Sequence, residues 1–206
     1  MTLTDTLDLA AVLVFALTGA LTASRAQLDI VGFIFVACLT AIGGGTLRDL
    51  LLGRDPVFWV SAPEYILLAA GAAVLVFFTA HLFESRYRAI LWLDALALAV
   101  AVSAGVGVAL SMEARAVNVV TMGVATGCFG GLMRDVVCNE VPLVLKQGEL
   151  YATAAFAGAL SALVALQFDL SLAVALIAAA VVTFILRAGS MVFGWTLPVY
   201  RPRPPR

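Results

Sequence analysis

The chain contains two copies of one sequence pattern, separated by 86 residues. Residues 40–60, TAIGGGTLRDLLLGRDPVFWV, recur without a gap as residues 126–146, TGCFGGLMRDVVCNEVPLVLK. Internal repeats with charges at matching places in apolar sequence are typical of membrane transport proteins built from two related halves. Each copy has an Arg-Asp pair within its apolar segment, and the same shift aligns more distant residues: Asp8 with Asp94, Gly19 with Gly105, and Tyr65 with Tyr151.

The composition is that of an integral membrane protein. Of the 206 residues, 63% are hydrophobic and 12% are charged, whereas a soluble domain has about 25% charged residues. The net charge of −1 gives no basis for binding nucleic acid. The glycine-rich string GGGT lacks the Lys-Ser/Thr that a phosphate-binding loop needs, so we expect no enzymatic activity.

Seven apolar segments are long enough to cross a membrane, since a span needs about 20 apolar residues. We therefore expect an all-α membrane protein with seven transmembrane helices in a single domain, residues 1–206. Spans 1–3 and 4–6 form two repeats, about residues 5–84 and 91–168, followed by an extra helix. Three spans per repeat is an odd number, so the two repeats should be inverted relative to each other. The segments are approximately 8–24, 29–52, 63–83, 90–111, 115–138, 148–167 and 171–193.

The loops carry their basic residues on one side of the membrane. With Arg48 and Arg134 set aside because they lie within spans, 2 Lys or Arg residues fall on the side of the N-terminus and 8 on the other. Basic loops stay in the cytoplasm. We therefore expect the N-terminus outside and the C-terminus in the cytoplasm.

Spans 2 and 5 contain glycine clusters, Gly43, Gly44 and Gly45 in the first and Gly130 and Gly131 in the second. Each glycine weakens a helix by about 1 kcal/mol relative to alanine. We expect a kink or an unwound turn that faces protein or water, because unsatisfied backbone cannot face lipid. Close helix packing through small residues is an alternative interpretation, and the two are compatible.

Each glycine cluster is followed by a charged pair, Arg48-Asp49 and Arg134-Asp135. A charge at a helix centre costs about 2.5–3.5 kcal/mol on insertion scales, so it should face a partner or a wet cavity. Since neighbours in sequence point about 100° apart on a helix, we expect pairing across the repeats, Arg48 with Asp135 and Arg134 with Asp49. The pairs either line or gate a pathway or merely lock the two halves together.

The doubled G-G-x-x-R-D motif, with seven spans in about 200 residues, resembles the prokaryotic trimeric intracellular cation (TRIC) channels, whose repeat is also catalogued as a bacterial glycine-transporter domain. The resemblance implies a homotrimer with one pore per protomer, lined by helices 2 and 5 and permeable to monovalent cations, chiefly potassium. It assigns the kinks to the glycine clusters and the pore charges to the Arg-Asp pairs. Phe129 stands where the first copy has Gly43, so it could plug the pore, and Thr46 and Thr126 could supply polar groups there.

Two function classes remain open: a passive cation channel, and an alternating-access carrier for a small amino acid such as glycine. We expect no cofactor and no metal centre. The expected partners are further copies of the chain, membrane lipids, and K⁺ or Na⁺ as the permeant ion, in the inner membrane of a bacterium.

Overall fold

The computed structural model describes residues 2–82 and 85–198, and its regular structure within this part is helical. The final basic residues that entered the orientation count, Arg201, Arg203 and Arg206, lie outside the described residues, as do the expected ends of span 3 and of the first repeat. The elements in order are α1 (Leu3–Arg25), α2 (Ile30–Leu52), α3 (Phe58–Ser61), α4 (Glu64–Thr79), η1 (Ala80–Leu82), α5 (Arg86–Ser111), α6 (Ala116–Val137), η2 (Leu143–Leu145), α7 (Ala152–Gln167) and α8 (Leu172–Phe193).

The prediction of an all-helical membrane protein is confirmed. Within the described residues, six helices are long and apolar enough to cross a membrane: α1, α2, α4 with η1, α5, α6 and α8. The segment expected as the sixth span, 148–167, is helical only over the 16 residues of α7. Residues 148–151 form a loop instead, in which Gly148 has a φ of +85°.

Local sequence explains where several helices begin and end. Thr2 and Asp5 form a reciprocal capping box at the start of α1. The carboxylate of Asp29 caps α2 by accepting from the amide of Gly32. Both α2 and α8 end at a glycine with a φ of +68°, Gly53 and Gly194, which is the conformation that glycine favours after a helix.

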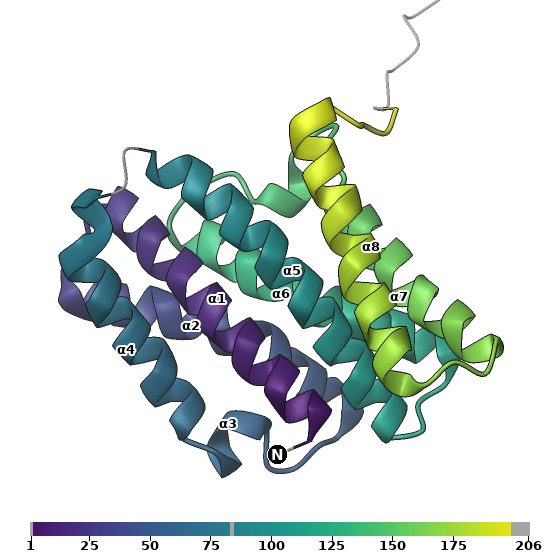
Figure 1. Ribbon diagram of the computed structural model, residues 1–206. Coiled ribbons are helices and arrows are strands. Elements are labelled where there is room, and N and C mark those ends of the chain that lie inside the picture. The colour runs from purple at the N-terminus through teal and green to yellow at the C-terminus, as the bar shows by residue number, and fades with distance from the viewer. Residues whose placement is uncertain (1, 83–84, 199–206) are drawn as a thin grey trace, which may run out of the picture.

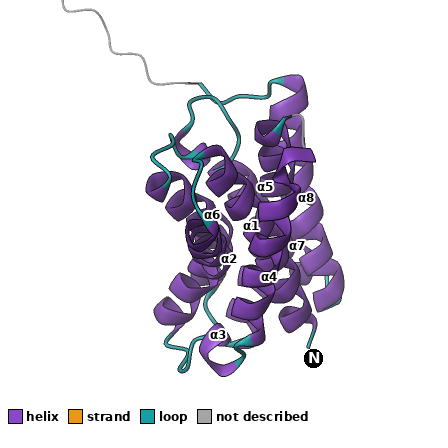
Figure 2. Ribbon diagram, turned by 90° about the vertical axis from the view of Figure 1, so that its left-hand side faces the viewer, coloured by secondary structure: helices purple, strands orange, loops and turns teal. Residues whose placement is uncertain are grey.

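Equivalent helices of the two repeats pack against each other. The 86-residue shift relates α1 to α5, α2 to α6 and α4 to α7, and the first two of these pairs are in contact. Figure 1 shows α1 alongside α5 in the centre of the molecule, and Figure 2 shows α2 beside α6. Helix α8 lies outside this arrangement and covers α5 and α7 (Figure 1).

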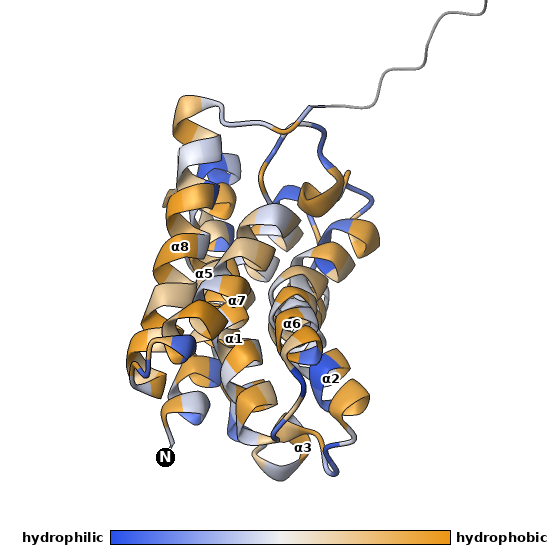
Figure 3. Ribbon diagram, turned by 90° about the vertical axis from the view of Figure 1, so that its right-hand side faces the viewer, coloured by the Kyte–Doolittle hydropathy of each residue, from blue (hydrophilic) through white to orange (hydrophobic). Residues whose placement is uncertain are grey.

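The interior is rich in alanine, whereas large apolar side chains point outward. Ala16, Ala37 and Ala104 are among many alanines that are completely buried. Phe35 on α2 and Leu67 on α4 are largely exposed, and Figure 3 shows that apolar residues make up most of the length of the helices. This distribution suits a lipid environment, in which small residues let helices approach closely and large ones face the lipid.

Candidate functional site

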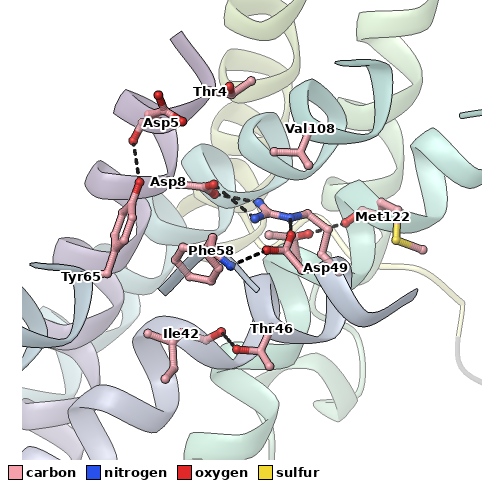
Figure 4. Close-up of polar contacts among 12 residues, drawn as sticks. Thr4, Asp5, Asp8, Ile42, Thr46, Asp49, Phe58, Tyr65, Val108 and Met122 are labelled. Atoms are coloured by element: carbon pink, nitrogen blue, oxygen red, sulfur yellow. Dashed lines mark hydrogen bonds and ion pairs between the residues drawn. The ribbon is translucent and has the colours of Figure 1, made fainter. Parts of the chain in front are cut away.

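The first Arg-Asp pair forms a buried charge cluster between α1 and α2. The guanidinium of Arg48 donates from Nε to Asp49 Oδ1 at 2.7 Å. It also holds Asp8 with two hydrogen bonds, from Nη1 to Oδ1 at 2.7 Å and from Nη2 to Oδ2 at 3.2 Å. Asp49 accepts a further hydrogen bond from the amide of Phe58 at 2.8 Å. Figure 4 shows both carboxylates directed at the guanidinium.

The second pair repeats this arrangement between α5 and α6. Arg134 donates from Nε to Asp135 Oδ1 and from Nη1 to Asp94 Oδ1, both at 2.8 Å. Asp135 accepts from the amide of Leu143 at 2.9 Å, as Asp49 does from that of Phe58. Arg134 is fully buried. The two clusters therefore use equivalent elements of the two repeats.

The predicted pairing across the repeats is wrong. Each arginine pairs with the aspartate next to it in sequence and with the aspartate 40 residues upstream in its own repeat. The i, i+1 contact forms because the long arginine side chain turns its Nε edge toward the adjacent carboxylate. Asp8 and Asp94 were the missed partners, and their alignment under the 86-residue shift was the available signal.

The ion pairs determine the net charge of each cluster. Two carboxylates hold each arginine, so each cluster has a formal charge of −1. A buried charge is stable in an apolar interior only when it is paired and hydrogen-bonded, and both guanidinium groups meet this need. Arg54 approaches Asp49 Oδ2 at 3.8 Å, but its side chain is 38% exposed, so solvent screens it.

The glycines mark the crossing of α2 and α6. A Cβ atom on Gly44 would collide with the carbonyl oxygen of Thr126, and one on Gly130 would collide with that of Thr40. Both helices are continuous through their glycines, so the expected unwound turn is wrong. Close packing explains the glycines, because the missing side chains let the two backbones touch.

The other glycines of the clusters face side chains. Gly45 lies against the ring of Phe58, and Gly131 against the hydroxyl of Tyr151. Gly43 lies against the side chain of Met133. None of these contacts tests the role in kinking that the sequence suggested, which stays a prediction.

The three remaining predicted residues occupy different environments. Thr46 donates to the carbonyl of Ile42 and accepts from Trp59 Nε1. Thr126 is buried, donates to the carbonyl of Met122, and borders a small central cavity. Phe129 lies instead in a wide apolar groove on α6 and α7, away from both charge clusters, which gives no support to a plug.

An acidic vestibule opens at the N-terminal end of α1. This cavity of about 380 Å³ is lined by three carboxylates, from Asp5, Asp8 and Glu64, together with Arg54 and Tyr65. Asp8 and Phe58 also line the central cavity, beside Gly44, Gly45 and Thr126. The central cavity measures only about 10 Å³, room for one water at most. Asp8 and Phe58 thus separate a wide mouth from a closed interior.

The second cluster differs from the first because several of its buried polar atoms have no hydrogen-bond partner within the part of the chain that the structure describes. Among the described residues, five buried side-chain polar atoms have no hydrogen-bond partner, and all belong to this cluster or to Arg187 beside it. Leaving such an atom unpaired costs about 1–3 kcal/mol, and more when the group is charged. The atoms are Asp94 Oδ2, Arg134 Nη2, Tyr151 OH, Arg187 Nε and Arg187 Nη2.

In the ranges 2–82 and 85–198, no group of three or more His, Cys, Asp or Glu side chains lies close enough together to hold an ion.

Comparison with known proteins places these features in context. A family model described as "Glycine transporter" matches twice, over residues 5–81 and 91–167, which are the two repeats. A UPF0126 membrane protein of Vibrio cholerae is 37% identical over 198 residues, which is 94% of this chain and 81% of that protein. The UPF0126 inner membrane protein YadS of Escherichia coli is 37% identical over 199 residues, 94% of each chain.

Solved structures of similar proteins are described as channels. The TRIC trimeric intracellular cation channel orthologue from Rhodobacter sphaeroides superposes with a TM-score of 0.91 at 44% identity, covering 94% of this chain and all of the other. A second structure, described as the basis for conductance through TRIC cation channels, has a TM-score of 0.86 at 31% identity and covers 99% of this chain and all of the other.

Proposed function

Since this chain belongs to the family that the glycine-transporter model describes, and the solved proteins that it resembles are TRIC cation channels, we propose that it is a passive channel for monovalent cations, chiefly potassium. Each protomer of a homotrimer carries its own pore. The trimer is proposed by analogy with the Rhodobacter sphaeroides orthologue, which is described as trimeric.

The charge of the two clusters is the observation that carries this proposal. A lone arginine in the pathway would repel a cation, but two carboxylates hold each arginine here, so each cluster is net negative. Three carboxylates face one arginine in the vestibule. Clefts lined by one sign of charge concentrate the counter-ion, so this mouth favours cations over anions.

The proposed pathway runs from the vestibule past Asp8 and Phe58 to the crossing of α2 and α6, and on to the cluster around Arg134. The central cavity is too small for a hydrated ion, so the arrangement described above is a closed state. Opening requires α2 and α6 to separate or rotate at the crossing. In this scheme the glycine clusters serve as both the contact and the hinge.

We propose the following topology. Helix α7 is a seventh span, because its equivalent α4 also has 16 residues and crosses the membrane together with η1. With three spans each, the two repeats are inverted. Most Lys and Arg residues of the loops are on the side of the membrane opposite the N-terminus, and basic loops stay in the cytoplasm. In this topology the N-terminus and the vestibule are outside, and the C-terminus is in the cytoplasm. The membrane is the bacterial inner membrane, as the description of the E. coli relative suggests.

Planar-bilayer recording of the purified protein in a KCl gradient tests the proposal. We expect discrete current steps, with a reversal potential closer to the equilibrium potential of K⁺ than to that of Cl⁻. Asp135→Asn should change the unitary conductance because it neutralises one cluster, whereas Cys128→Ala, in the apolar groove on α6, should not. Silent bilayers, together with saturable glycine uptake into liposomes from the same preparation, would overturn the channel in favour of a carrier.

A further inference from the structure

The two repeats differ at the places where a vestibule is expected. The first vestibule is bordered by Asp8 and by residues 62–65, including Tyr65. The 86-residue shift maps these residues to Asp94 and to residues 148–151, including Tyr151. By symmetry a second vestibule should open there, on the opposite side of the membrane. Tyr151 and Asp94 are instead 1% and 0% exposed, against 8% and 7% for Tyr65 and Asp8.

The C-terminal end of α8 occupies this place (Figure 1). Arg187 donates from Nη1 to Glu149 Oε2 at 2.6 Å, and its guanidinium lies over the ring of Tyr151, 5.0 Å from the ring centre. Ser190 accepts from the amide of Leu150 at 3.0 Å. Side chains of α8 thus hold each residue of the segment 149–151.

The residues that follow α8 make further contacts at the same place. Ser190 donates to the carbonyl of Trp195 at 2.9 Å. The indole of Trp195 packs directly on Gly189, where a Cβ atom would collide with it, and Thr196 lies next to Gly148. These contacts place residues 195–196 over the loop that precedes α7.

Beneath the C-terminal end of α8, several buried polar atoms have no hydrogen-bond partner among the described residues. The five buried atoms without a partner in the described part of the chain lie in the cluster around Arg134, on Tyr151 itself and on Arg187. The end of α8 buries these groups without giving them protein hydrogen-bond partners. Uncovering would hydrate these groups, which would offset part of the loss of the contacts that α8 makes with Glu149, Leu150 and Tyr151.

We propose that the C-terminal end of α8 is the gate of the second mouth of the pathway. When Arg187 releases Glu149, and Ser190 releases Leu150, the segment 149–151 swings away and opens a cytoplasmic vestibule equivalent to the first. Tyr151 is the side chain that moves off the charge cluster. This inference rests on the proposed channel function.

Glu149→Gln tests the gate, because it removes the negative charge that pairs with Arg187. The side chain of Glu149 is one-third exposed, so the fold should tolerate the change. We expect the ratio of open to closed time to rise about tenfold or more, the effect of losing one charge-assisted hydrogen bond. Glu149→Asp, which retains the charge, should stay near the wild type. Glu140→Gln is the matched control, since it breaks the ion pair between Arg25 and Glu140. The two side chains of that pair are 33% and 32% exposed.

Hydroxyl-radical footprinting of the protein in lipid nanodiscs supplies a readout that needs no current. Oxidation of Tyr151 should rise in Glu149→Gln and stay unchanged in Glu140→Gln, with Tyr65 as the internal reference. If Tyr151 oxidation and gating are unchanged in Glu149→Gln while the wild type conducts, the gate is overturned and the channel stands. If the wild type itself carries no current, the proposed function fails first.

Discussion

Gly44 in α2 lies so close to the carbonyl oxygen of Thr126 in α6 that no Cβ atom fits between them. Under the 86-residue shift this contact becomes that of Gly130 with the carbonyl oxygen of Thr40, which is equally tight. The pair of reciprocal contacts sets the separation of the two helices beside the central cavity. Any change in this separation must act on both contacts at once.

Gly44→Ala should therefore destabilise the protein. The added methyl group meets backbone, which cannot turn aside as a side chain can, so α2 and α6 must move apart. Overpacking of this kind costs about 1–3 kcal/mol. A lower midpoint of thermal unfolding in detergent would reveal it. Gly71→Ala is the control, because a Cβ atom there meets nothing within 4 Å, and equal stability of both variants would contradict the packing role.

Neutralising Asp8 should weaken cation selectivity. Asp8→Asn keeps the shape of the side chain but takes the first cluster from −1 to a formal charge of zero. One unit charge within about 4 Å attracts a cation by about 1 kcal/mol even in water, so the K⁺ to Cl⁻ permeability ratio should fall about fivefold. Reversal potentials in a KCl gradient measure this ratio.

Asp29→Asn is the matched control for Asp8→Asn. It removes the same charge from an exposed position at the start of α2, where asparagine caps a helix as well as aspartate does. A selectivity loss of the same size in both variants would show that Asp8 has no special place in the pathway.

A double-mutant cycle tests the pairing within each repeat. Arg134→Gln alone leaves Asp94 and Asp135 buried without their counter-charge, and breaking a buried pair costs about 3–5 kcal/mol. Adding Asp94→Asn should recover part of that loss, because the two side chains form a direct 2.8 Å hydrogen bond. Unfolding free energies of the single and double variants give the coupling.

The cross-repeat combination is the reference for this cycle. Arg134→Gln with Asp49→Asn should be additive within about 0.5 kcal/mol, as expected for residues that share no contact. Coupling of Arg134 to Asp49 but not to Asp94 would reverse the assignment.

Phe58→Leu should enlarge the passage between the vestibule and the central cavity. The ring of Phe58 borders both cavities, packs edge-on against Tyr65 at 4.9 Å and lies beneath the guanidinium of Arg48 at 5.5 Å. We expect a larger unitary current, with a stability loss of about 1–3 kcal/mol because the smaller side chain fills less space. Phe35→Leu, on the exposed outer side of α2, should leave the current unchanged.

The repeat predicted the architecture better than it predicted the contacts. Because equivalent residues occupy equivalent places, the 86-residue shift predicts the glycines of α2 and α6 and both buried arginines from the sequence alone. It did not reveal what the glycines touch. Glycine lowers helix stability, but close packing against Thr40 and Thr126 offsets that effect, so the helices stay continuous where the sequence suggested a break.

The partners of the arginines could not be read from local spacing. Helix geometry places i and i+1 side chains apart at Cβ, but it does not limit a long side chain such as that of Arg48, which folds back to Asp49. Asp8 became a partner only through the packing of α1 on α2. The identical 40-residue separation of Asp8 from Arg48 and of Asp94 from Arg134 was present in the sequence, and it is the pattern that would have identified both pairs.

The charge balance within each repeat has a consequence for the origin of the molecule. Asp8 and Asp49 pair with the buried arginine of the first repeat, and Asp94 and Asp135 with that of the second, without a carboxylate from the other half. A half-length chain of this design would therefore bury its central arginine, Arg48 or Arg134, with both carboxylate partners in place. An ancestral single-repeat protein would thus have needed only the helix contacts between two copies, α1 with α5 and α2 with α6, to form the present arrangement before gene fusion joined the halves.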